Sequence, residues 1–283
     1  MVDVSVRKEP LMSQDPPTPS QRRRFSRSPA AWIAGTSDIG SKHRTNQDAM
    51  CLAVREQPAP VAVIAVSDGV STARGSEIAS LVASEAAVAS LTESVSQRQD
   101  PSIAFTEAFQ AAHDAVLQAA DDPSACTLIA AIMAPDGITV GNVGDSRAYW
   151  ISDSSTSYLL STDDSMAQAR IMLGMDRHTA ENSPQAHSIT KWLGRDATDI
   201  TPSVVAYQPT THGWLLLCSD GLWNYASSVE EMHQLITGTL AEHPDTEAAT
   251  QALADWANEQ GGRDNITVVL ARYQGKTLEA ETT

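Results

Sequence analysis

The sequence predicts an α+β fold, in which pairs of helices lie on one β-sheet or on two stacked sheets. Segments with the period of a strand and segments with the period of a helix occur in separate runs: strands, two helices, strands, two helices and a last strand. Several of the strand-like runs end in an acidic residue and a turn. No internal repeat or linker divides residues 30–273, so we expect one domain.

The first half of the chain contains three predicted strands and two predicted helices. Short apolar runs at 31–36, 47–54 and 60–66 are typical of strands. Apolar residues then recur at helical spacing over 77–95 and 103–120. Because only a short polar segment links the two helices, they are predicted to form an antiparallel pair.

The second half repeats this alternation of strands and helices. Its predicted elements are strands at 126–133, 138–143, 147–151, 157–160 and 204–207, a strand beginning at Trp214, helices at 229–240 and 246–259, and a strand at 266–273. The Asp136-Gly137 pair indicates a hairpin turn between the first two strands. Residues 163–190 are polar and rich in Met and show no strand pattern, which predicts an irregular, partly helical insertion.

The two ends of the chain differ from its body. Residues 1–29 are rich in Pro, Ser, Gln and Arg and predict a disordered basic tail, and 274–283 predict a short polar tail. The basic block 22–28 is either a docking or kinase site or simply a solvated part of this tail. Residues 1–30 hold six basic and three acidic residues, whereas the remainder holds 13 basic and 32 acidic residues. Such an acidic body is not expected to bind nucleic acid.

The cysteines indicate a reducing compartment. Cys51, Cys126 and Cys218 lie in apolar runs and form no CxxC pair, which argues against a disulfide framework and against a zinc site. No apolar run approaches the roughly 20 residues that span a bilayer, and the N-terminus lacks the apolar segment of a signal peptide. We therefore expect a cytoplasmic protein that does not act at a membrane.

Acidic residues stand at the ends of four predicted strands: Asp68, Asp145, Asp220 and Asp264. Carboxylates gathered at one end of a sheet repel one another and raise each other's pKa unless a cation lies between them. The spacing therefore predicts a metal site with oxygen ligands. The motifs around these residues, in order, are His43-Arg44-Thr45-Asn46-Gln47-Asp48, Ser67-Asp68-Gly69, Gly144-Asp145-Ser146-Arg147, Ser219-Asp220-Gly221 and Gly262-Arg263-Asp264-Asn265.

In this order the motifs resemble those of the metal-dependent PP2C-like (PPM) family of protein serine/threonine phosphatases, over roughly residues 34–272. The resemblance implies a four-layer αββα fold, a β-sandwich flanked by antiparallel helix pairs, with a flap at about 163–190 beside the active site. It also implies that a metal-activated water hydrolyses phosphoserine and phosphothreonine on proteins, so that no protein nucleophile is needed.

The same resemblance assigns metal ligands. Asp68 would bridge two divalent ions, and the Gly69 carbonyl would bind one of them. Asp220 and Asp264 would complete the first ion, and Asp145 with Asp220 would form a third site. Ligation by oxygen alone favours Mn²⁺ or Mg²⁺ over zinc, so two such ions, with a third site available, are the expected cofactors.

Four positions near Asp48, which would hold metal-bound waters, bear on catalysis. His43 stands where the family has a phosphate-binding Arg, and either His43 or the adjacent Arg44 would take that role. Gln47 replaces a family Glu, which removes a negative charge and is expected to weaken the second ion. Val70 replaces a His that acts as a general acid in eukaryotic members.

The predicted function is therefore a monomeric protein serine/threonine phosphatase. Its partners would be phosphorylated proteins, the targets of a serine/threonine kinase. Because His43, Gln47 and Val70 depart from the family pattern, the alternative is a weak or inactive pseudophosphatase that serves as a regulatory binding module. Arg74 is either an additional phosphate contact or a surface residue.

Overall fold

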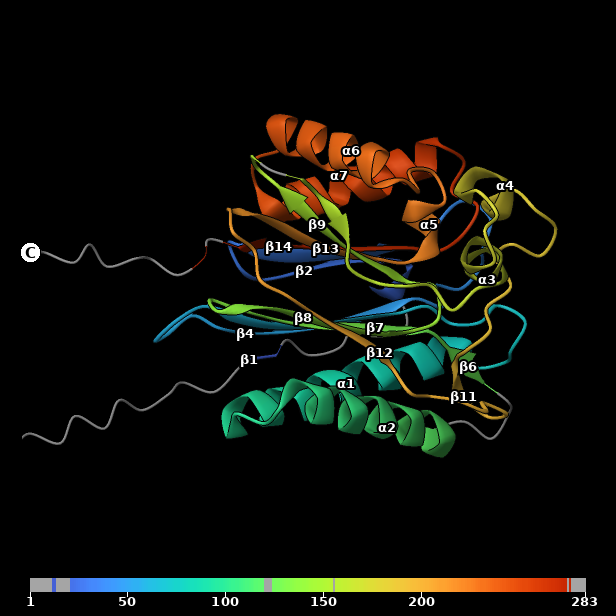
Figure 1. The fold of residues 1–283 in the computed structure, drawn as a ribbon, viewed down its shortest axis with the longest axis horizontal. Coiled ribbons are helices and arrows are strands. Elements are labelled where there is room, and N and C mark those ends of the chain that lie inside the picture. The colour runs from blue at the N-terminus through green and yellow to red at the C-terminus, as the bar shows by residue number, and fades with distance from the viewer. Residues whose placement is uncertain (1–11, 14–20, 120–123, 155, 274, 276–283) are drawn as a thin grey trace, which may run out of the picture.

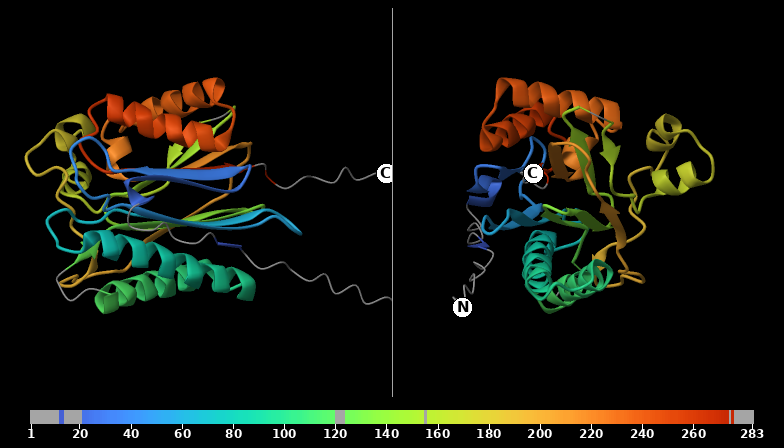
Figure 2. Two further views of the ribbon diagram at one scale, coloured as in Figure 1. Left: turned by 180° about the vertical axis from the view of Figure 1, so that it is seen from behind. Right: turned by 60° about the vertical axis from the view of Figure 1, so that its left-hand side comes forward.

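The computed structural model describes residues 12–13, 21–119, 124–154, 156–273 and 275. Two six-stranded sheets are stacked face to face, and a helix pair covers the outer face of each (Figure 1). The two views of Figure 2 show the same four layers from behind and from one side. The predicted α+β class and the αββα arrangement are confirmed.

The first sheet has the strand order β1-β4-β5-β7-β8-β12, and all its neighbouring strands are antiparallel. Its strands are β1 (Met12–Ser13), β4 (Ala49–Arg55), β5 (Val61–Ser67), β7 (Leu128–Ala134), β8 (Gly137–Val143) and β12 (Ser203–Tyr207). Every residue of β5 is buried, because this strand lies inside the sheet with helices on one side and the second sheet on the other. Burial on both faces explains its unbroken apolar run.

The second sheet has the order β10-β9-β13-β14-β3-β2, again antiparallel throughout. Its strands are β10 (Tyr158–Leu159), β9 (Arg147–Ser152), β13 (Gly213–Cys218), β14 (Ile266–Tyr273), β3 (Ile33–Asp38) and β2 (Arg24–Ala30). A short ladder of β6 (Ala125–Cys126) with β11 (Leu193–Gly194) lies beside the sandwich.

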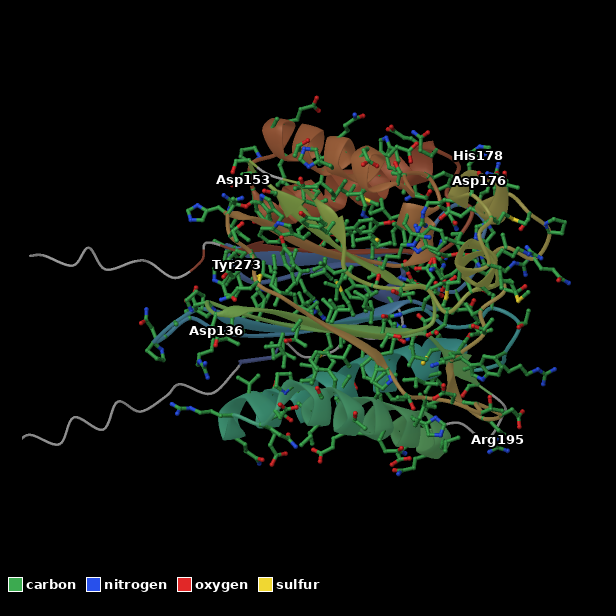
Figure 3. The ribbon with its side chains drawn as sticks, viewed as in Figure 1. Asp136, Asp153, Asp176, His178, Arg195 and Tyr273 are labelled. Carbon is green, nitrogen blue, oxygen red and sulfur yellow. The ribbon has the colours of Figure 1, made fainter. Side chains whose placement is uncertain are left out.

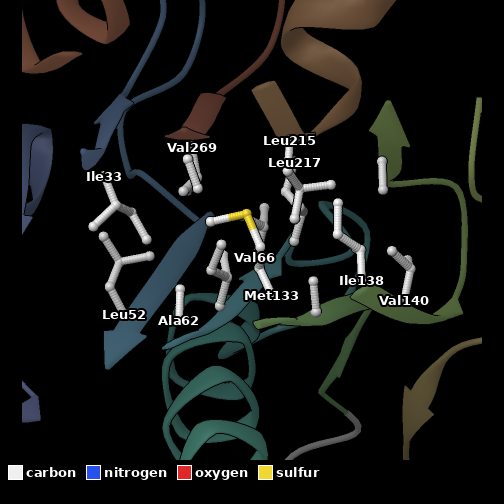
Figure 4. Close-up of a cluster of buried hydrophobic side chains, with 14 of the residues drawn as sticks. Ile33, Leu52, Ala62, Val66, Met133, Ile138, Val140, Leu215, Leu217 and Val269 are labelled. Carbon is white, nitrogen blue, oxygen red and sulfur yellow. The ribbon is translucent and has the colours of Figure 1, made fainter. Parts of the chain in front are cut away.

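Apolar side chains from the facing strands fill the space between the sheets (Figure 4). Val66 of the first sheet and Leu217 and Val269 of the second are fully buried there. A Cβ atom on Gly35 would lie 2.5 Å from the Met50 sulfur and 2.9 Å from the Val269 side chain. Only glycine therefore allows the sheets to approach this closely at β3.

Helices α1 (Ser76–Gln97) and α2 (Pro101–Ala119) cover the first sheet, and α6 (Val229–Glu242) and α7 (Thr246–Glu259) cover the second. Helix α1 is long and apolar enough to cross a membrane by length and composition alone. In the structure its small side chains at every fourth position, Ala79, Ala83 and Ala87, are fully buried in the cluster that joins it to the sheet and α2. This packing is typical of a helix in the core of a globular domain.

The insertion between β10 and β11 carries two short helices, α3 (Met166–Met172) and α4 (Arg177–Glu181). They stand at one end of the sandwich, beyond the strands (Figure 1). The polar sequence of 163–190 thus predicted its irregular, partly helical structure. The adjacent four-residue helix α5 (Asp220–Trp223) was not predicted, because it is too short to show a helical period.

The prediction of a disordered tail through residue 29 is wrong for Met12–Ser13, which form β1 beside β4, and for residues 21–29. A 3-10 turn, η1 (Gln21–Arg23), leads into β2, which pairs with β3 and forms the edge of the second sheet. The Phe25 side chain is buried in the core between the sheets, and Arg24 forms ion pairs with Asp38 and Asp255. The basic composition that suggested a solvated tail thus belongs to an ordered edge strand. Residues 1–11, 14–20, 274 and 276–283, the rest of both predicted tails, lie outside the described residues.

Candidate active site

The acidic residues of the motifs lie at the strand ends on one end of the sandwich. Ala49 of β4 pairs with Ser67 of β5, so Asp48 and Asp68, which flank these residues, lie side by side. In the second sheet Cys218 of β13 pairs with Arg147 of β9 and with Val268 of β14. This register brings the neighbouring residues Asp145, Asp220 and Asp264 to the same end of that sheet, where α5 begins (Figure 1). The antiparallel pairing therefore gathers residues that are far apart in the sequence.

The acidic side chains of the two sheets lie close enough together to raise one another's pKa. Burial raises the pKa of Asp68 well above its ordinary value, and the charges of Asp48, Asp220, Asp264 and Asp145 raise it further. The pKa of Asp220 is raised in the same way, by burial and then by its acidic neighbours. We refer to these five residues as the acidic cluster. Its excess of negative charge favours either protons or cations.

Asp48 is the most deeply buried member of the cluster, with none of its surface exposed. Its Oδ2 accepts hydrogen bonds from Ser219 Oγ at 2.7 Å and from Thr267 Oγ1 at 2.8 Å. Its Oδ1 has no partner in the described structure. Burial raises the pKa of Asp48 to about 6, against the two hydroxyl donors, which lower it.

Asp145 and Asp220 are held by different contacts. The main-chain oxygen of Asp145 accepts a hydrogen bond from Trp223 Nε1 at 2.9 Å. Burial and then the charge of Asp163 raise the pKa of Asp145 to about 7. Asp220 Oδ2 accepts from Asn224 Nδ2 at 3.1 Å, whereas Asp220 Oδ1 has no partner among the described residues. Two buried carboxylate oxygens, one on each side of the cluster, thus lack the donor that a buried oxygen normally has.

The donor set fits Mn²⁺ or Mg²⁺, because it consists of carboxylate and carbonyl oxygens and includes the two unpartnered oxygens. As placed, no three His, Cys, Asp or Glu side chains of the described residues lie close enough together to hold an ion. The predicted ligands Asp68, Asp145, Asp220 and Asp264 therefore share one acidic cluster without forming a closed coordination shell. Their role as metal ligands stays a prediction, which their chemistry and clustering support.

Gly69 lies in a tight turn of the site. A Cβ atom there would lie 2.7 Å from both the Gln47 and the Ser76 carbonyl oxygens. The Gly69 amide donates to the Gln47 carbonyl oxygen at 3.1 Å, and the Gln47 side-chain nitrogen donates to Ser76 Oγ. The amide nitrogen of Gln47 is thus engaged, and binding of an ion by its side-chain oxygen stays a prediction.

Of the two candidate phosphate-binding residues, the structure brings His43 to the cluster. His43 Nε2 lies 3.2 Å from Asp264 Oδ1. Arg44 is exposed and makes no hydrogen bond or ion pair with the described residues. Arg74 is also exposed, in the loop after Gly69. The two arginines are thus free to reach a substrate but are not fixed in place.

Asn265 is a site residue to which the sequence assigned no role. Its Nδ2 donates to the Ile39 carbonyl at 2.8 Å and to the Thr45 carbonyl at 3.3 Å, and its Oδ1 accepts from the Gln47 amide at 2.7 Å. Asn265 therefore fastens the loop of the first motif to the fifth motif. Its position directly after Asp264 is the feature of the sequence that could have indicated this role.

Arg147 connects the insertion to the acidic cluster. Its guanidinium, which is 1% exposed, donates to Asp163 at 2.7 Å and to Glu181 at 3.1 Å. The same group lies over the Trp223 ring, 3.7 Å from the ring centre. Because Trp223 donates to the Asp145 carbonyl, the insertion, α5 and one predicted ligand form a continuous network.

A cleft of about 810 Å³ separates the insertion from α5 and the start of α6. It is lined by Arg177, His178, His187, Arg263 and Asp264, among others. In Figure 3 His178 and Asp176 mark this end of the molecule, whereas Asp136 and Tyr273 mark the opposite end. The acidic cluster therefore lies beside a cleft that carries both basic and acidic side chains.

A four-layer αββα domain with carboxylates from both sheets at one end is the fold and site expected of a metal-dependent phosphatase domain. Comparison with known proteins agrees. The protein phosphatase 2C family matches residues 34–258 of the sequence. The chain belongs to this family.

The most informative relatives are bacterial. The serine/threonine phosphatase stp of Listeria innocua is 35% identical over 148 residues, which cover 51% of this chain and 55% of the relative. The chain thus spans about half the length of that relative. The PPM Ser-Thr phosphatase MsPP of Mycobacterium smegmatis, solved in complex with cacodylate, is 29% identical, with a TM-score of 0.63 over 86% of this chain and 98% of that one.

The catalytic domain of the serine/threonine protein phosphatase PstP, solved in complex with two manganese ions, has the same fold. Its TM-score is 0.65 at 23% identity, and the match covers 86% of this chain and 98% of that one.

Proposed function

We propose that the protein is a protein serine/threonine phosphatase that depends on Mn²⁺ or Mg²⁺. The observation that carries the proposal is the acidic cluster, in which Asp48 and Asp220 each present a buried oxygen without a partner. Membership of the protein phosphatase 2C family supports the reaction class. The names of the relatives and the manganese bound to PstP support the substrate class and the metal.

The residues of the acidic cluster would have the following roles. Asp68, Asp220 and Asp264, with the Gly69 carbonyl, would hold two divalent ions, and Asp145 with Asp220 would provide a third position. When bound, such ions acidify water and neutralise the charge of the phosphoryl oxygens. Asp48, fixed by two hydroxyl donors on its Oδ2, would orient water through its free Oδ1.

The substrate would reach the site through the cleft beside the insertion, and the lining of this cleft includes Arg177 and Arg263 as well as Glu181 and Glu231. Asp264 lines the cleft together with the exposed Arg263, and His43 lies against Asp264. A phosphate group placed there would find a cation within reach of the ligands. We propose phosphorylated proteins, products of a serine/threonine kinase, as the substrates.

We further propose that the protein acts as a monomer in the cytoplasm. The described residues contain no disulfide, and burial raises the pKa of Cys126 to about 12. A chain whose described cysteines form no disulfide suits a reducing compartment.

The direct test is hydrolysis of p-nitrophenyl phosphate and of a phosphothreonine peptide with Mn²⁺, with Mg²⁺ and with EDTA. We expect turnover that requires the metal and disappears with EDTA. Asp68→Asn and Asp220→Asn should each lower kcat by two orders of magnitude or more, on the order of the loss of one essential electrostatic group. Asp153→Asn, at a surface ion pair with Arg272, is the matched control and should retain full activity. A folded protein that is inert under all conditions would instead establish the pseudophosphatase.

A further inference from the structure

The N-terminal segment 21–30 touches the active site although it precedes the part of the chain that matches the family. The family match begins at residue 34. Segment 21–30, which comprises η1 and β2, lies before it and forms the edge of the second sheet. Its contacts are therefore a property of this chain that the family match does not specify.

The backbone of η1 holds both ends of the loop that carries His43 and Gln47. The Arg22 carbonyl accepts a hydrogen bond from Asn46 Nδ2 at 2.8 Å, and the Arg23 carbonyl accepts one from the Ile39 amide at 2.8 Å. Asn46 Oδ1 in turn accepts from the Asp48 amide at 3.1 Å. The turn at residues 21–23 is thus tied to loop 39–48 at its start and at its end.

The Arg22 side chain extends from this turn to the starts of β4 and α1. Only 7% of the residue's surface is exposed. Its Nη2 donates to the Asp48 carbonyl at 2.8 Å, and its Nη1 donates to the Glu77 carbonyl in the first turn of α1 at 2.5 Å. One planar guanidinium therefore joins the start of β4 to the start of α1, a geometry that Lys cannot reproduce with both bonds.

The two elements that Arg22 joins are the ones that enclose Gly69. The Gln47 carbonyl from one side and the Ser76 carbonyl from the other approach the Gly69 position. Buried Arg22 has a charge partner in Glu85 of the same helix: Arg22 lowers the pKa of Glu85, against the larger effect of burial. Arg22 Nε and Glu85 Oε1 both lack hydrogen-bond partners in the described structure. The side chain is therefore held by the two carbonyl bonds and by charge.

We infer that Arg22 is a positioning residue for the active site: it fixes loop 39–48, and with it Asp48 and Gln47, against the start of α1. The inference rests on the proposed function, since it assigns Arg22 a role in the metal site. Arg22 contacts backbone oxygens and no predicted ligand atom, so it acts through Asp48 and the Gly69 turn.

The test compares Arg22→Met and Arg22→Lys with Arg23→Gln, which removes the same charge from the exposed neighbouring arginine. In Arg22→Met we expect faster amide hydrogen exchange in residues 39–48 of the metal-free protein. We also expect weaker Mn²⁺ binding by calorimetry, by about tenfold or more, as for other residues that orient ligands. The kcat for p-nitrophenyl phosphate at saturating Mn²⁺ should fall by a similar factor, with a smaller change in KM. Arg22→Lys should lie between Arg22→Met and the wild type, and Arg23→Gln should match the wild type.

Unchanged exchange in residues 39–48 and unchanged Mn²⁺ affinity in a folded Arg22→Met protein would overturn the inference. If Arg22→Met does not fold, the double variant Arg22→Met/Glu85→Leu removes both charges together, with Glu85→Leu as its control, and the same two readouts decide. If the wild type has no phosphatase activity, the proposed function fails. The exchange measurement on the metal-free protein would then still show whether Arg22 positions the loop.

Discussion

At the scale of single residues, the acidic cluster makes the metal-free protein sensitive to pH. Burial raises the pKa of Asp48 to about 6 and of Asp145 to about 7, so the folded protein binds protons that the unfolded chain has already released. The stabilising effect of these protons is complete below the unfolded pKa of about 4 and is lost as the pH rises through 6 and 7. Asp199, whose pKa its hydrogen bond from Lys191 lowers to about 2, titrates outside this window.

We therefore predict that the metal-free protein is less stable at pH 8 than at pH 5. A net effect of about 2 kcal/mol would lower Tm by about 5 °C for a chain of this size. Thermal unfolding in EDTA measures it, and Asp145→Asn should flatten the profile because it removes one of the groups whose pKa is raised. A metal-free Tm that rises steadily from pH 5 to pH 8 would contradict this assignment.

Two glycines provide a second prediction at this scale. Gly69→Ala places a Cβ atom 2.7 Å from two carbonyl oxygens, whereas a Cβ atom on Gly238, inside α6, meets nothing within 4 Å. We expect Gly69→Ala to lower the free energy of unfolding by about 1–3 kcal/mol and to abolish Mn²⁺-dependent turnover. Gly238→Ala should raise the free energy of unfolding by about 0.5–1 kcal/mol and leave activity unchanged. Urea unfolding of both variants tests the pair, and equal effects would show that the turn at Gly69 is not tight.

At the scale of elements, Arg147 is the main attachment of the insertion. It binds Asp163 just before α3 and Glu181 at the end of α4, and it is almost fully buried. Arg147→Met would leave the buried Asp163 without its cation and would remove one of the two arginines on Glu181. Loss of one partner of a buried ion pair typically costs about 3–5 kcal/mol. We expect rapid proteolysis within 163–190 and a reduced kcat, because Trp223 and the Asp145 carbonyl lose the support of the guanidinium.

The matched control is Arg177→Gln, which removes the more exposed of the two arginines on Glu181 and keeps Arg147. It should leave the insertion resistant to protease. Equal cleavage of both variants would show that Arg147 has no special role in holding the insertion.

Some helices and strands of the fold could be predicted from the sequence, and others could not. The apolar run of β5 and the helical periods of α6 and α7 depend on local patterns and were predicted from them. Strand β2 was missed because its four arginines in and around residues 22–27 resemble those of a disordered tail, and its pairing with β3 is visible only in three dimensions. The features of the site likewise include some that short motifs predict and some that they do not.

Short motifs predicted which residues gather at the acidic cluster, since antiparallel register carries strand ends to one place. The contacts of Arg22 with Asp48 and of Arg147 with Glu181 join residues that no local pattern relates. The motifs also could not decide whether His43 or Arg44 faces Asp264. The two residues are adjacent in the sequence, and the conformation of the loop determines which side chain points to Asp264.

At the scale of the whole molecule, charge is the dominant property. The formal net charge is −16, and the cleft beside the insertion is lined by Glu181, Glu231 and Asp264 as well as by Arg177 and Arg263. A strongly acidic protein repels acidic partners at long range and attracts basic ones. Substrate proteins should therefore be selected partly by the charge around the phosphorylated residue.

We predict that a phosphothreonine peptide with basic flanking residues has a higher kcat/KM at low ionic strength than one with acidic flanking residues. The difference, expected to be about tenfold or more, should shrink at 0.5 M salt because the Debye length then falls below ~5 Å. p-Nitrophenyl phosphate, which has no flanking charge, serves as the control. A salt-independent ratio would mean that only local contacts in the cleft select the peptide.

The origin of the ligands in two separate sheets has a consequence for folding. Asp48 and Asp68 extend from the first sheet, Asp220 and Asp264 from the second, and Asp145 lies on the segment that crosses from β8 to β9. A folding intermediate with only one sheet formed would hold at most part of the cluster. Divalent ions would bind only after the sheets have docked, and by mass action they would then draw the chain toward that last step. The cation would thus stabilise only the last step of folding. A molecule that gains activity would be one in which the two sheets have already docked.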